Sequence, residues 1–208
     1  MTDPNLEWAI LERQPIEVSR CLKTKSVGIA GLGGLGSVVA ENLARAGVGH
    51  LVLVDFDVIE PSNLNRQRYF ADQLGQLKTE ALAVHLKRMS LFIRFTCYSE
   101  KVSSQNCSRL FQGCDVVVEC LDDPENKADL LFGLRKWFPS VPVVAASGMA
   151  GLEGLDKIRI EKRMQHVYVV GDQTTDAQDG HGLFASKVGV VACMQSHVVI
   201  QLLAGVRE

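Results

Sequence analysis

Short apolar runs alternate along most of this chain with longer segments in which apolar residues recur every three or four positions. The runs have the length and continuity of strands that are buried on both faces, and the longer segments have helical spacing. We expect strands at residues 27–30, 51–54, 93–98, 116–120 and 141–146, and helices at residues 34–46, 78–89, 104–112, 125–137 and 184–204. This alternation predicts an α/β, Rossmann-like fold with a mostly parallel sheet and helices on both faces.

The pattern changes after Gly154. Apolar and polar residues alternate singly over residues 157–161 and 167–169, and no long helical segment separates these two stretches. We expect them to form an antiparallel C-terminal extension of the sheet. Residues 171–182 are rich in Gly, Asp, Gln and Thr and predict a loop.

The first 24 residues form an N-terminal arm ahead of the first predicted strand. We expect a helical turn or two over residues 6–11, interrupted near Pro15. Residues 25–208 have the size of a single domain with one core.

A glycine-rich turn links the first predicted strand to the first long helix, with Gly31, Gly33, Gly34 and Gly36 in the run GLGGLG. A strand, a glycine turn and a helix N-terminus in this order form a phosphate cradle, because the first amides of the helix have no partner within it. Asp55 ends the second strand, where its carboxylate can accept hydrogen bonds from ribose hydroxyls. The alternative is close packing of helix on strand without a ligand.

Charged residues collect where the predicted strands end. Arg66 lies in the polar loop after Asp55, and Lys78 begins the next helix. Both are placed to hold the outer phosphates of a nucleoside triphosphate, although two solvated surface cations would have the same spacing. Asp122 and Asp123 follow the fourth strand. A carboxylate there can bind Mg²⁺ or cap the helix that starts near Pro124, and one residue can do each.

Composition narrows the class of protein. The 208 residues carry a formal net charge of −2 and are 47% hydrophobic, with acidic and basic residues interspersed. This balance argues against a nucleic-acid coat or a polybasic membrane anchor. The polar N-terminus and the absence of a run of about 20 apolar residues predict no signal peptide, no membrane span and a cytoplasmic location. The six cysteines form no Cys-x-x-Cys pair and are expected to be core residues, so no zinc site is expected.

Taken together, the ordered motifs resemble the ThiF/MoeB/HesA superfamily of ubiquitin-activating-enzyme-like proteins. The motifs are GLGGLG at 31–36, VDFD at 54–57, SNLNRQ at 62–67, GQLK at 75–78, CLDD at 120–123, AASGMAG at 145–151 and GLFASKVG at 182–189. More narrowly, the chain resembles the short second ThiF family, which adenylates the sulfur carrier protein ThiS in thiamin biosynthesis.

The resemblance implies ATP-dependent, magnesium-assisted activation of the C-terminal glycine carboxylate of a ubiquitin-like carrier by a homodimer. It places Asp55 on the ribose, Asn63 and Arg66 near the phosphates, Lys78 on the triphosphate and Asp122 on magnesium. Arg66, Lys78 and Asp122 are the implied catalytic residues. The implied nucleotide-binding set is Gly31, Gly33, Gly34, Gly36, Asp55, Asp57, Asn63, Arg66, Gln67, Lys78 and Asp123.

Two departures from the superfamily pattern limit what carries over. The Cys-x-x-Cys pairs that hold a structural zinc in larger relatives are missing. The crossover loop, residues 171–182, contains no cysteine, so we expect no covalent thioester on it. Its polar residues, Asp172, Asp176, Asp179 and His181, are expected to clamp the carrier's tail or to be mobile. Relatives also borrow an arginine from the partner's N-terminal arm, and Arg13, with Arg20 behind it, is the candidate here.

Three other functions remain open at this stage. The glycine turn and Asp55 would serve an NAD-dependent dehydrogenase equally well, although Arg66 and Lys78 count against it. A second member of the superfamily, the tRNA threonylcarbamoyladenosine dehydratase, also activates a carboxylate with ATP, but the net charge gives little support for a tRNA surface. A nucleotide-sensing module would not need groups that hold a leaving pyrophosphate.

Overall fold

A single mixed sheet organises the chain. The computed structural model describes residues 4–90, 92–176 and 180–206. Within these residues seven strands lie in the order β3-β2-β1-β4-β5-β7-β6. Every neighbouring pair is parallel except β6 and β7. The strands are β1 (Ser26–Ala30), β2 (His50–Val54), β3 (Arg94–Tyr98), β4 (Val116–Glu119), β5 (Val143–Ala146), β6 (Arg159–Met164) and β7 (Val167–Gly171). The predicted parallel sheet and its antiparallel C-terminal extension are confirmed.

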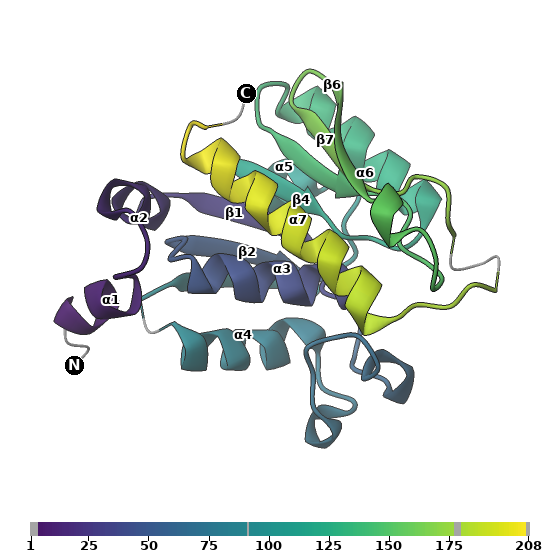
Figure 1. Cartoon of the computed structure of the whole chain (residues 1–208), viewed down its shortest axis with the longest axis horizontal. Helices are drawn as coiled ribbons and strands as arrows, with labels where there is room; N and C mark the ends of the chain where they lie inside the picture. Colours follow the sequence, from purple (N-terminus) through teal and green to yellow (C-terminus); the bar gives the residue numbers. More distant parts are fainter. Residues whose placement is uncertain (1–3, 91, 177–179, 207–208) are drawn as a thin grey trace.

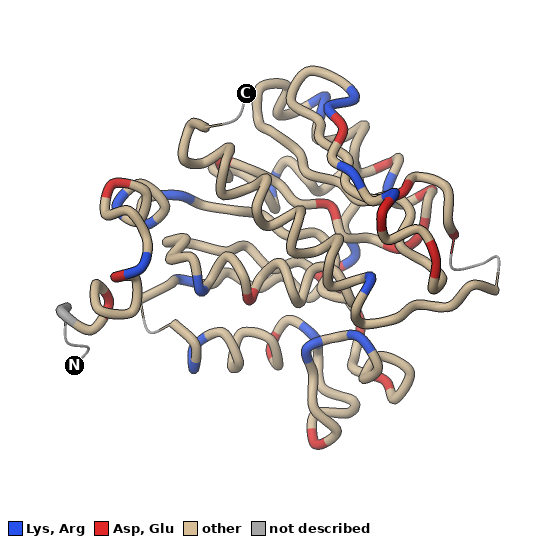
Figure 2. Tube along the Cα trace, in the orientation of Figure 1, with Lys and Arg blue, Asp and Glu red and all other residues tan. Residues whose placement is uncertain are grey.

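Helices cover both faces of this sheet (Figure 1). They are α1 (Pro4–Ile10), α2 (Ile16–Lys23), α3 (Gly34–Arg45), α4 (Lys78–Met89), α5 (Cys107–Leu110), α6 (Pro124–Trp137) and α7 (Ala185–Leu203), with short 3₁₀ turns at η1 (Pro61–Asn63), η2 (Ala71–Gln73) and η3 (Leu155–Lys157). Figure 2 shows acidic and basic residues interspersed along these elements, in keeping with the small net charge.

Alternate side chains of the strands enter two separate cores. Ile29 and Leu53 belong to the larger core, which includes residues of α3, α4 and α7. Val52 and Val117 belong to the smaller core, which includes residues of α5 and α6. Because successive side chains of a strand point to opposite faces, a strand buried on both sides is expected to be mostly apolar. This is the case for residues 27–30 of β1, 51–54 of β2 and 116–118 of β4.

Helix α7 is the central helix of the larger core. It packs against α3 and against strands β4, β5 and β7. The helix is long and apolar enough, with a mean hydropathy of 1.3, to cross a membrane. However, 50% of its apolar stretch is buried inside the fold, as expected of a core helix. The prediction of a largely apolar, buried helix over residues 184–204 is confirmed, with the helix itself running from Ala185 to Leu203.

The structure differs from the sequence-based expectation in two places. The arm contains a second helix, α2, which begins directly after Pro15 and buries Leu22. The helix expected at residues 104–112 is limited to the four residues of α5, because the Asn106 side chain accepts a hydrogen bond from the Ser103 amide and closes a turn before it.

The strand register brings the ends of three strands to one level. Ala30 pairs with Val54 on one side and with Glu119 on the other. The glycine turn, Asp55 and the segment after β4 therefore leave the sheet side by side, at its carboxyl edge. The arm enters β1 from the opposite edge, where the Cys21 thiol of α2 donates to the Leu203 carbonyl at the end of α7 (3.2 Å).

Candidate functional site

A cavity of about 490 Å³ lies at the carboxyl edge of the sheet. Its walls come from the glycine turn, the loops after β2, β3, β4 and β5, and the segment that leads into α7. The residues lining it include Gly31, Gly33, Gly34, Asp55, Asp57, Arg66, Gln67, Lys78 and Asp122, all of which the sequence analysis singled out. Gly36, Asn63 and Asp123 are described but are not among the lining residues.

The glycine turn has the conformation of a tight strand-to-helix connection. Gly31 has a φ of +87°, which favours glycine, and a Cβ there would lie 2.8 Å from the Cys120 carbonyl oxygen. A Cβ on Gly36 would lie 1.8 Å from the Gly31 carbonyl oxygen. Gly36 therefore allows α3 to pack on its own turn, while Gly33, Gly34 and Leu35 present the start of the helix to the cavity.

Asp55 holds the glycine turn from below. Its Oδ2 accepts a hydrogen bond from the Leu32 amide (2.6 Å), and its Oδ1 accepts one from the Asp57 amide (2.8 Å). The Tyr69 hydroxyl donates to the Leu32 carbonyl (2.8 Å), so the backbone amide and carbonyl of Leu32 are both held by side chains. Burial raises the pKa of the Asp55 carboxyl, against the opposing effect of the Lys78 ammonium and the two amides.

Lys78 and Arg66 approach the cavity from the loop after β2. Lys78 is buried, and its Nζ lies 2.7 Å from Oδ2 of Asp57. Arg66 donates to the Ser62 carbonyl (3.0 Å) and to Oδ1 of Asn65 (2.8 Å). The stem of Arg66 runs beside the first residue of α3, because a Cβ on Gly34 would lie 3.3 Å from the Arg66 Cγ. The structure therefore brings both predicted cations to the start of α3.

Gln67 and Asn63 have different positions within this loop. Gln67 is buried, and its Oε1 has no hydrogen-bond partner among the described residues. A buried acceptor without a partner at a cavity wall is expected to meet a donor on a bound molecule. Asn63 is buried beneath the loop, where its Oδ1 accepts from the Glu60 amide (3.1 Å). It shapes the turn that presents Arg66 and Gln67.

The neighbouring aspartates after β4 separate into two roles. Asp123 is the N-cap of α6 and accepts a hydrogen bond from the Asn126 amide (2.8 Å). Asp122 is exposed at the cavity, and within the part of the chain that the structure describes its carboxylate has no ion-pair or hydrogen-bond partner. In the same residues no three His, Cys, Asp or Glu side chains gather into a metal cluster. A cation at Asp122 would therefore need oxygens from a bound ligand, which is the usual arrangement for Mg²⁺ on a nucleotide.

Sequence reasoning missed several residues of the cavity wall. Lys127 of α6 donates to both carboxylate oxygens of the fully buried Glu119 (2.8 and 2.6 Å) and to the Ala146 carbonyl (2.9 Å). An ionisable Glu at the end of the buried run Val-Val-Val-Glu was the available signal, because a buried carboxylate requires a partner. Other lining residues that the sequence analysis did not assign to the site include Phe56, Glu100, Lys101, Val102, Leu121, Asn126, Ser147, Gly148, Met149, Ala150, Thr175, Leu183 and Val188.

The crossover loop departs from its sequence-based interpretation at Asp172. This residue is 3% exposed and pairs with the buried Lys187 of α7 (2.9 Å), so it neither clamps a carrier's tail directly nor is mobile. Thr175 and Asp176 line the cavity. His181 is exposed, and Asp179 lies outside the described residues.

The expectation that the cysteines are core residues is confirmed for Cys107, Cys114 and Cys120 and wrong for Cys21, Cys97 and Cys193, which are at least partly exposed. Burial raises the pKa of the Cys114 thiol to about 11 and that of the Cys120 thiol well above its ordinary value. Cys107 is also buried, whereas Cys97 and Cys193 are exposed and Cys21 is intermediate. All six are free thiols.

The arm keeps Arg13 away from the cavity of its own chain. Arg13 lies between α1 and α2, which precede the amino end of β1 (Figure 1), and the cavity lies beyond the carboxyl end of the same strand. A five-residue strand spans about 17 Å. Arg20 in α2 pairs with Glu17 (3.5 Å). Neither arginine reaches the cavity within one chain.

Comparison with known proteins decides the family. Residues 9–208 match the ThiF family. The chain belongs to the ThiF family. The resemblance seen in the motifs is therefore confirmed across nearly the whole length of the sequence.

Curated relatives of this ThiF-family chain are longer proteins. The adenylyltransferase and sulfurtransferase MOCS3-1 of Drosophila pseudoobscura pseudoobscura is 30% identical over 191 residues, which cover 90% of this chain and 42% of that protein. The adenylyltransferase and sulfurtransferase UBA4 of Yarrowia lipolytica is 30% identical over 190 residues, which cover 89% of this chain and 47% of that protein. The ThiF-family chain thus spans less than half the length of these relatives.

Solved structures share the fold. The Escherichia coli tRNA N6-threonylcarbamoyladenosine dehydratase TcdA, in complex with AMP, superposes with a TM-score of 0.85 at 19% identity and covers 95% of this chain and 93% of its own. E. coli MccB with ATP superposes with a TM-score of 0.73 at 24% identity and covers 93% of this chain and 60% of its own. At these identities the likeness establishes the ThiF-family fold.

Proposed function

We propose that this chain is an ATP-dependent adenylyltransferase that activates the C-terminal glycine carboxylate of a ubiquitin-like sulfur carrier protein of the ThiS type, in thiamin biosynthesis. The observation that carries the proposal is one cavity that combines a glycine turn, two cations and the unpartnered carboxylate of Asp122. The names of the curated relatives, which are adenylyltransferases, support the same kind of reaction.

The glycine turn and Asp55 suit the nucleoside and the phosphates of ATP. The amides at the start of α3 are free to bind phosphate oxygens. Each oxygen of the Asp55 carboxylate accepts one backbone hydrogen bond and retains capacity for a second, from a ribose hydroxyl. The unpartnered Oε1 of Gln67 is a further acceptor for a hydroxyl or amino group of the nucleotide.

The carrier's carboxylate needs no general base. A C-terminal carboxyl group has an ordinary pKa of about 3.5 and is ionised at neutral pH. One of its oxygens forms a bond to the α-phosphorus of ATP, and the bond from that phosphorus to the bridging oxygen of the β-phosphate breaks. The electron pair of the broken bond leaves with pyrophosphate, and the acyl adenylate remains. This accounts for a site that lacks a Ser-His-Asp or Cys-His arrangement among the described residues.

The protein's contribution is to position two anions and to neutralise charge that develops on the phosphates. Lys78 and Arg66 supply that charge from one side. Asp122 would hold Mg²⁺ together with phosphate oxygens, and the bound ion would offset negative charge on the triphosphate. Asp123 supports Asp122 by fixing the first turn of α6.

Two further parts of the proposal concern the assembly. We place the protein in the cytoplasm, where carrier and ATP meet. We also infer a homodimer in which Arg13 of one arm reaches the cavity of the other chain, because within one chain the sheet separates them.

ATP–pyrophosphate exchange with purified ThiS tests the activity. Exchange that depends on the carrier is expected, and Asp122→Ala and Arg66→Ala are each expected to lower it by ~100-fold or more, as removal of a charge-stabilising group does. Exchange of wild-type size in both variants would place the site elsewhere.

A second candidate function is dehydration of N6-threonylcarbamoyladenosine in tRNA. It is favoured by the TM-score of 0.85 to TcdA over almost the whole of both chains. Exchange with threonylcarbamoyladenosine-containing tRNA and none with ThiS would establish that reading. No ATP–pyrophosphate exchange with either substrate would favour a nucleotide sensor or an NAD-binding protein. A measurement of binding of reduced or oxidised NAD would then distinguish the NAD-binding protein from the sensor.

A further inference from the structure

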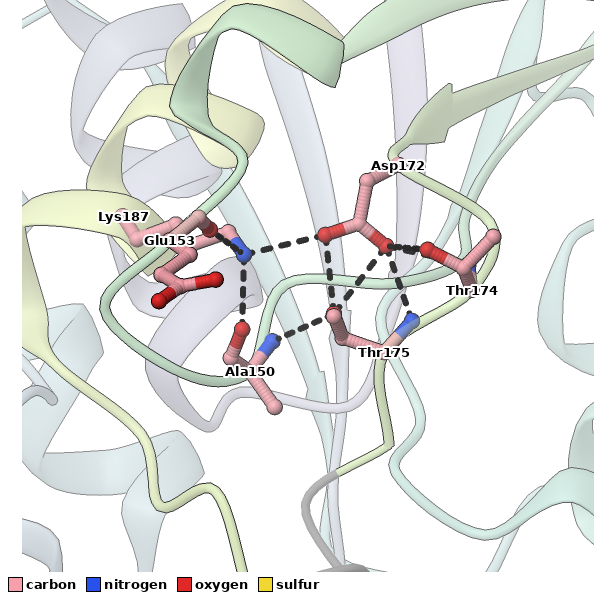
Figure 3. A network of polar contacts seen from close by, with 6 residues as sticks. All are labelled: Ala150, Glu153, Asp172, Thr174, Thr175 and Lys187. Atoms are coloured by element: carbon pink, nitrogen blue, oxygen red, sulfur yellow. Dashed lines mark hydrogen bonds and ion pairs between the residues drawn. The ribbon is translucent and has the colours of Figure 1, made fainter.

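The ammonium group of Lys187 is buried at the point where three segments meet (Figure 3). It donates to Oδ2 of Asp172 (2.9 Å), to the Ala150 carbonyl (2.6 Å) and to the Glu153 carbonyl (2.8 Å). A lysine ammonium has three hydrogens, so its donor capacity is fully used. The first turn of α7 is thereby tied to the start of the crossover loop and to residues 150–153.

Asp172 also accepts hydrogen bonds from residues of the crossover loop and so connects Lys187 to that loop. Its Oδ1 accepts from the Thr174 amide (3.0 Å) and the Thr175 amide (2.9 Å), and its Oδ2 accepts from the Thr175 hydroxyl (2.8 Å). The same hydroxyl accepts a hydrogen bond from the Ala150 amide (3.1 Å). Figure 3 shows the Thr175 side chain between Asp172 and Ala150, so it connects two segments that are far apart in sequence.

The two ends of this network differ in their access to the cavity. Thr175 and Ala150 line the cavity, whereas Asp172 and Lys187 stand behind it among the described residues. The ion pair can therefore influence a bound molecule through lining residues that its side chains hold, and Thr175 and Ala150 are the two joined to it by hydrogen bonds of the network. It shapes the wall without touching the ligand.

Thr175 and Ala150 lie on the opposite side of β1 from Asp55, the residue proposed to bind the ribose. In the sheet order, β2 and β3 lie on one side of β1, and β4, β5 and β7 lie on the other. Asp55, at the end of β2, marks the ribose side. Ala150 follows β5 and Thr175 follows β7, so they face the half of the cavity that ATP leaves to a second substrate.

We infer that Asp172 and Lys187 are positioning residues that hold Thr175 and Ala150 against the acceptor, the C-terminal tail whose carboxylate is activated. This inference rests on the proposed function. It assigns acceptor binding, rather than ATP binding, to the buried pair. It also predicts that the Thr175 hydroxyl matters as a bridge to the Ala150 amide.

The matched substitutions Thr175→Val and Thr175→Ser test the bridge in the full-length protein. Valine keeps the shape and removes the hydroxyl, and serine keeps the hydroxyl. In ATP–pyrophosphate exchange with ThiS, T175V is expected to raise the KM for ThiS by ~10-fold or more, because small displacements of positioning groups are costly, and to leave the KM for ATP within about twofold. T175S is expected to match the wild type. Equal rises in both KM values, or equal effects of T175V and T175S, would overturn the inference.

Asp172→Asn tests the pair behind the wall, with Val199→Ala as a control for lost stability. Val199 is fully buried in the last part of α7, away from the cavity. D172N is expected to raise the KM for ThiS and to speed hydrogen exchange at the Thr175 and Ala150 amides, while V199A does neither. The hydrogen-exchange measurement needs no acceptor. Unchanged hydrogen exchange of the Thr175 and Ala150 amides in D172N would overturn the inference. If the wild type shows no ThiS-dependent ATP–pyrophosphate exchange, the proposed function itself is overturned instead.

Discussion

The Nζ of Lys78 and Oδ2 of Asp57 lie 2.7 Å apart at the mouth of the cavity, with the lysine side chain 6% exposed and the aspartate side chain 45% exposed. A buried ammonium needs a counter-charge, and the half-exposed carboxylate supplies it at little cost to itself. A triphosphate is a stronger counter-charge for the same ammonium. We therefore propose that this ion pair holds Lys78 in position for a phosphate group.

Lys78→Met follows directly from this relationship. The variant removes a charge aimed at the phosphates and is expected to lower carrier-dependent ATP–pyrophosphate exchange by ~100-fold. Lys87→Met, in the exposed last turn of the same helix, is the control and is expected to exchange at the wild-type rate. Similar rates in K78M and K87M would remove Lys78 from the site.

Asp122→Ala and Asp123→Ala separate two adjacent carboxylates. D123A loses an N-cap and is expected to lower the free energy of unfolding by about 1 kcal/mol. D122A has no partner to lose among the described residues and is expected to stay within about 0.5 kcal/mol of the wild type. Urea unfolding measures both values. A larger loss of stability in D122A than in D123A would contradict the assignment of the cap.

Gly36→Ala and Gly189→Ala form a second matched pair. A Cβ on Gly36 would lie 1.8 Å from a backbone oxygen, so G36A is expected to lower the free energy of unfolding by about 1–3 kcal/mol and to weaken ATP binding. A Cβ on Gly189 meets nothing within 4 Å, so G189A is expected to stabilise α7 by about 0.5–1 kcal/mol. Chemical unfolding and calorimetric titration with ATP check both, and a wild-type-like G36A would contradict the packing of α3 on its turn.

Stability at acid pH tests the state of Asp172. Burial favours the protonated form of this carboxyl, but hydrogen bonds from the Thr174 and Thr175 amides and from Lys187 outweigh it, and the pKa lies well below its ordinary value. The unfolded chain takes up the proton near pH ~3.9, so the contribution of Asp172 to stability is complete above that pH and declines as the pH falls below it.

In Asp172→Asn this contribution is absent at every pH. The difference in free energy of unfolding between wild type and D172N is expected to be largest at about pH 6 and to narrow toward about pH 3. Urea unfolding at a series of pH values gives the difference. A gap that is constant with pH would show that folding does not lower the pKa of this carboxyl.

The fold followed closely from the sequence because its main determinants are local. The sequence has uninterrupted apolar runs at residues 27–30, 51–54 and 116–118, which indicate burial on both faces of the sheet. Lys78–Met89 is a helix over the predicted range. Helix α2 was missed because an interruption was predicted near Pro15, whereas the helix begins directly after that residue. Its place is fixed by tertiary contact with α7 instead.

The site was predictable where chemistry and position coincide along the chain. The glycine turn and Asp55 directly follow strands, Lys78 begins a helix, and Arg66 lies in the loop between Asp55 and Lys78. Asp172 could not be assigned in this way, because its partner Lys187 is fifteen residues away across the crossover loop. Asn63 and Asp123 are residue types that often bind ligands, but here their side chains accept hydrogen bonds from backbone amides. Only the hydrogen-bond geometry distinguishes ligand binding from this structural role.

The contact between Cys21 and Leu203 has a practical consequence. It joins the segment near the start of the chain to the segment near its end, at the edge of the sheet opposite the cavity. A fluorescent fusion or a surface-immobilisation tag placed after α7 would therefore lie at the edge of the sheet opposite the cavity and leave the cavity free for an incoming protein.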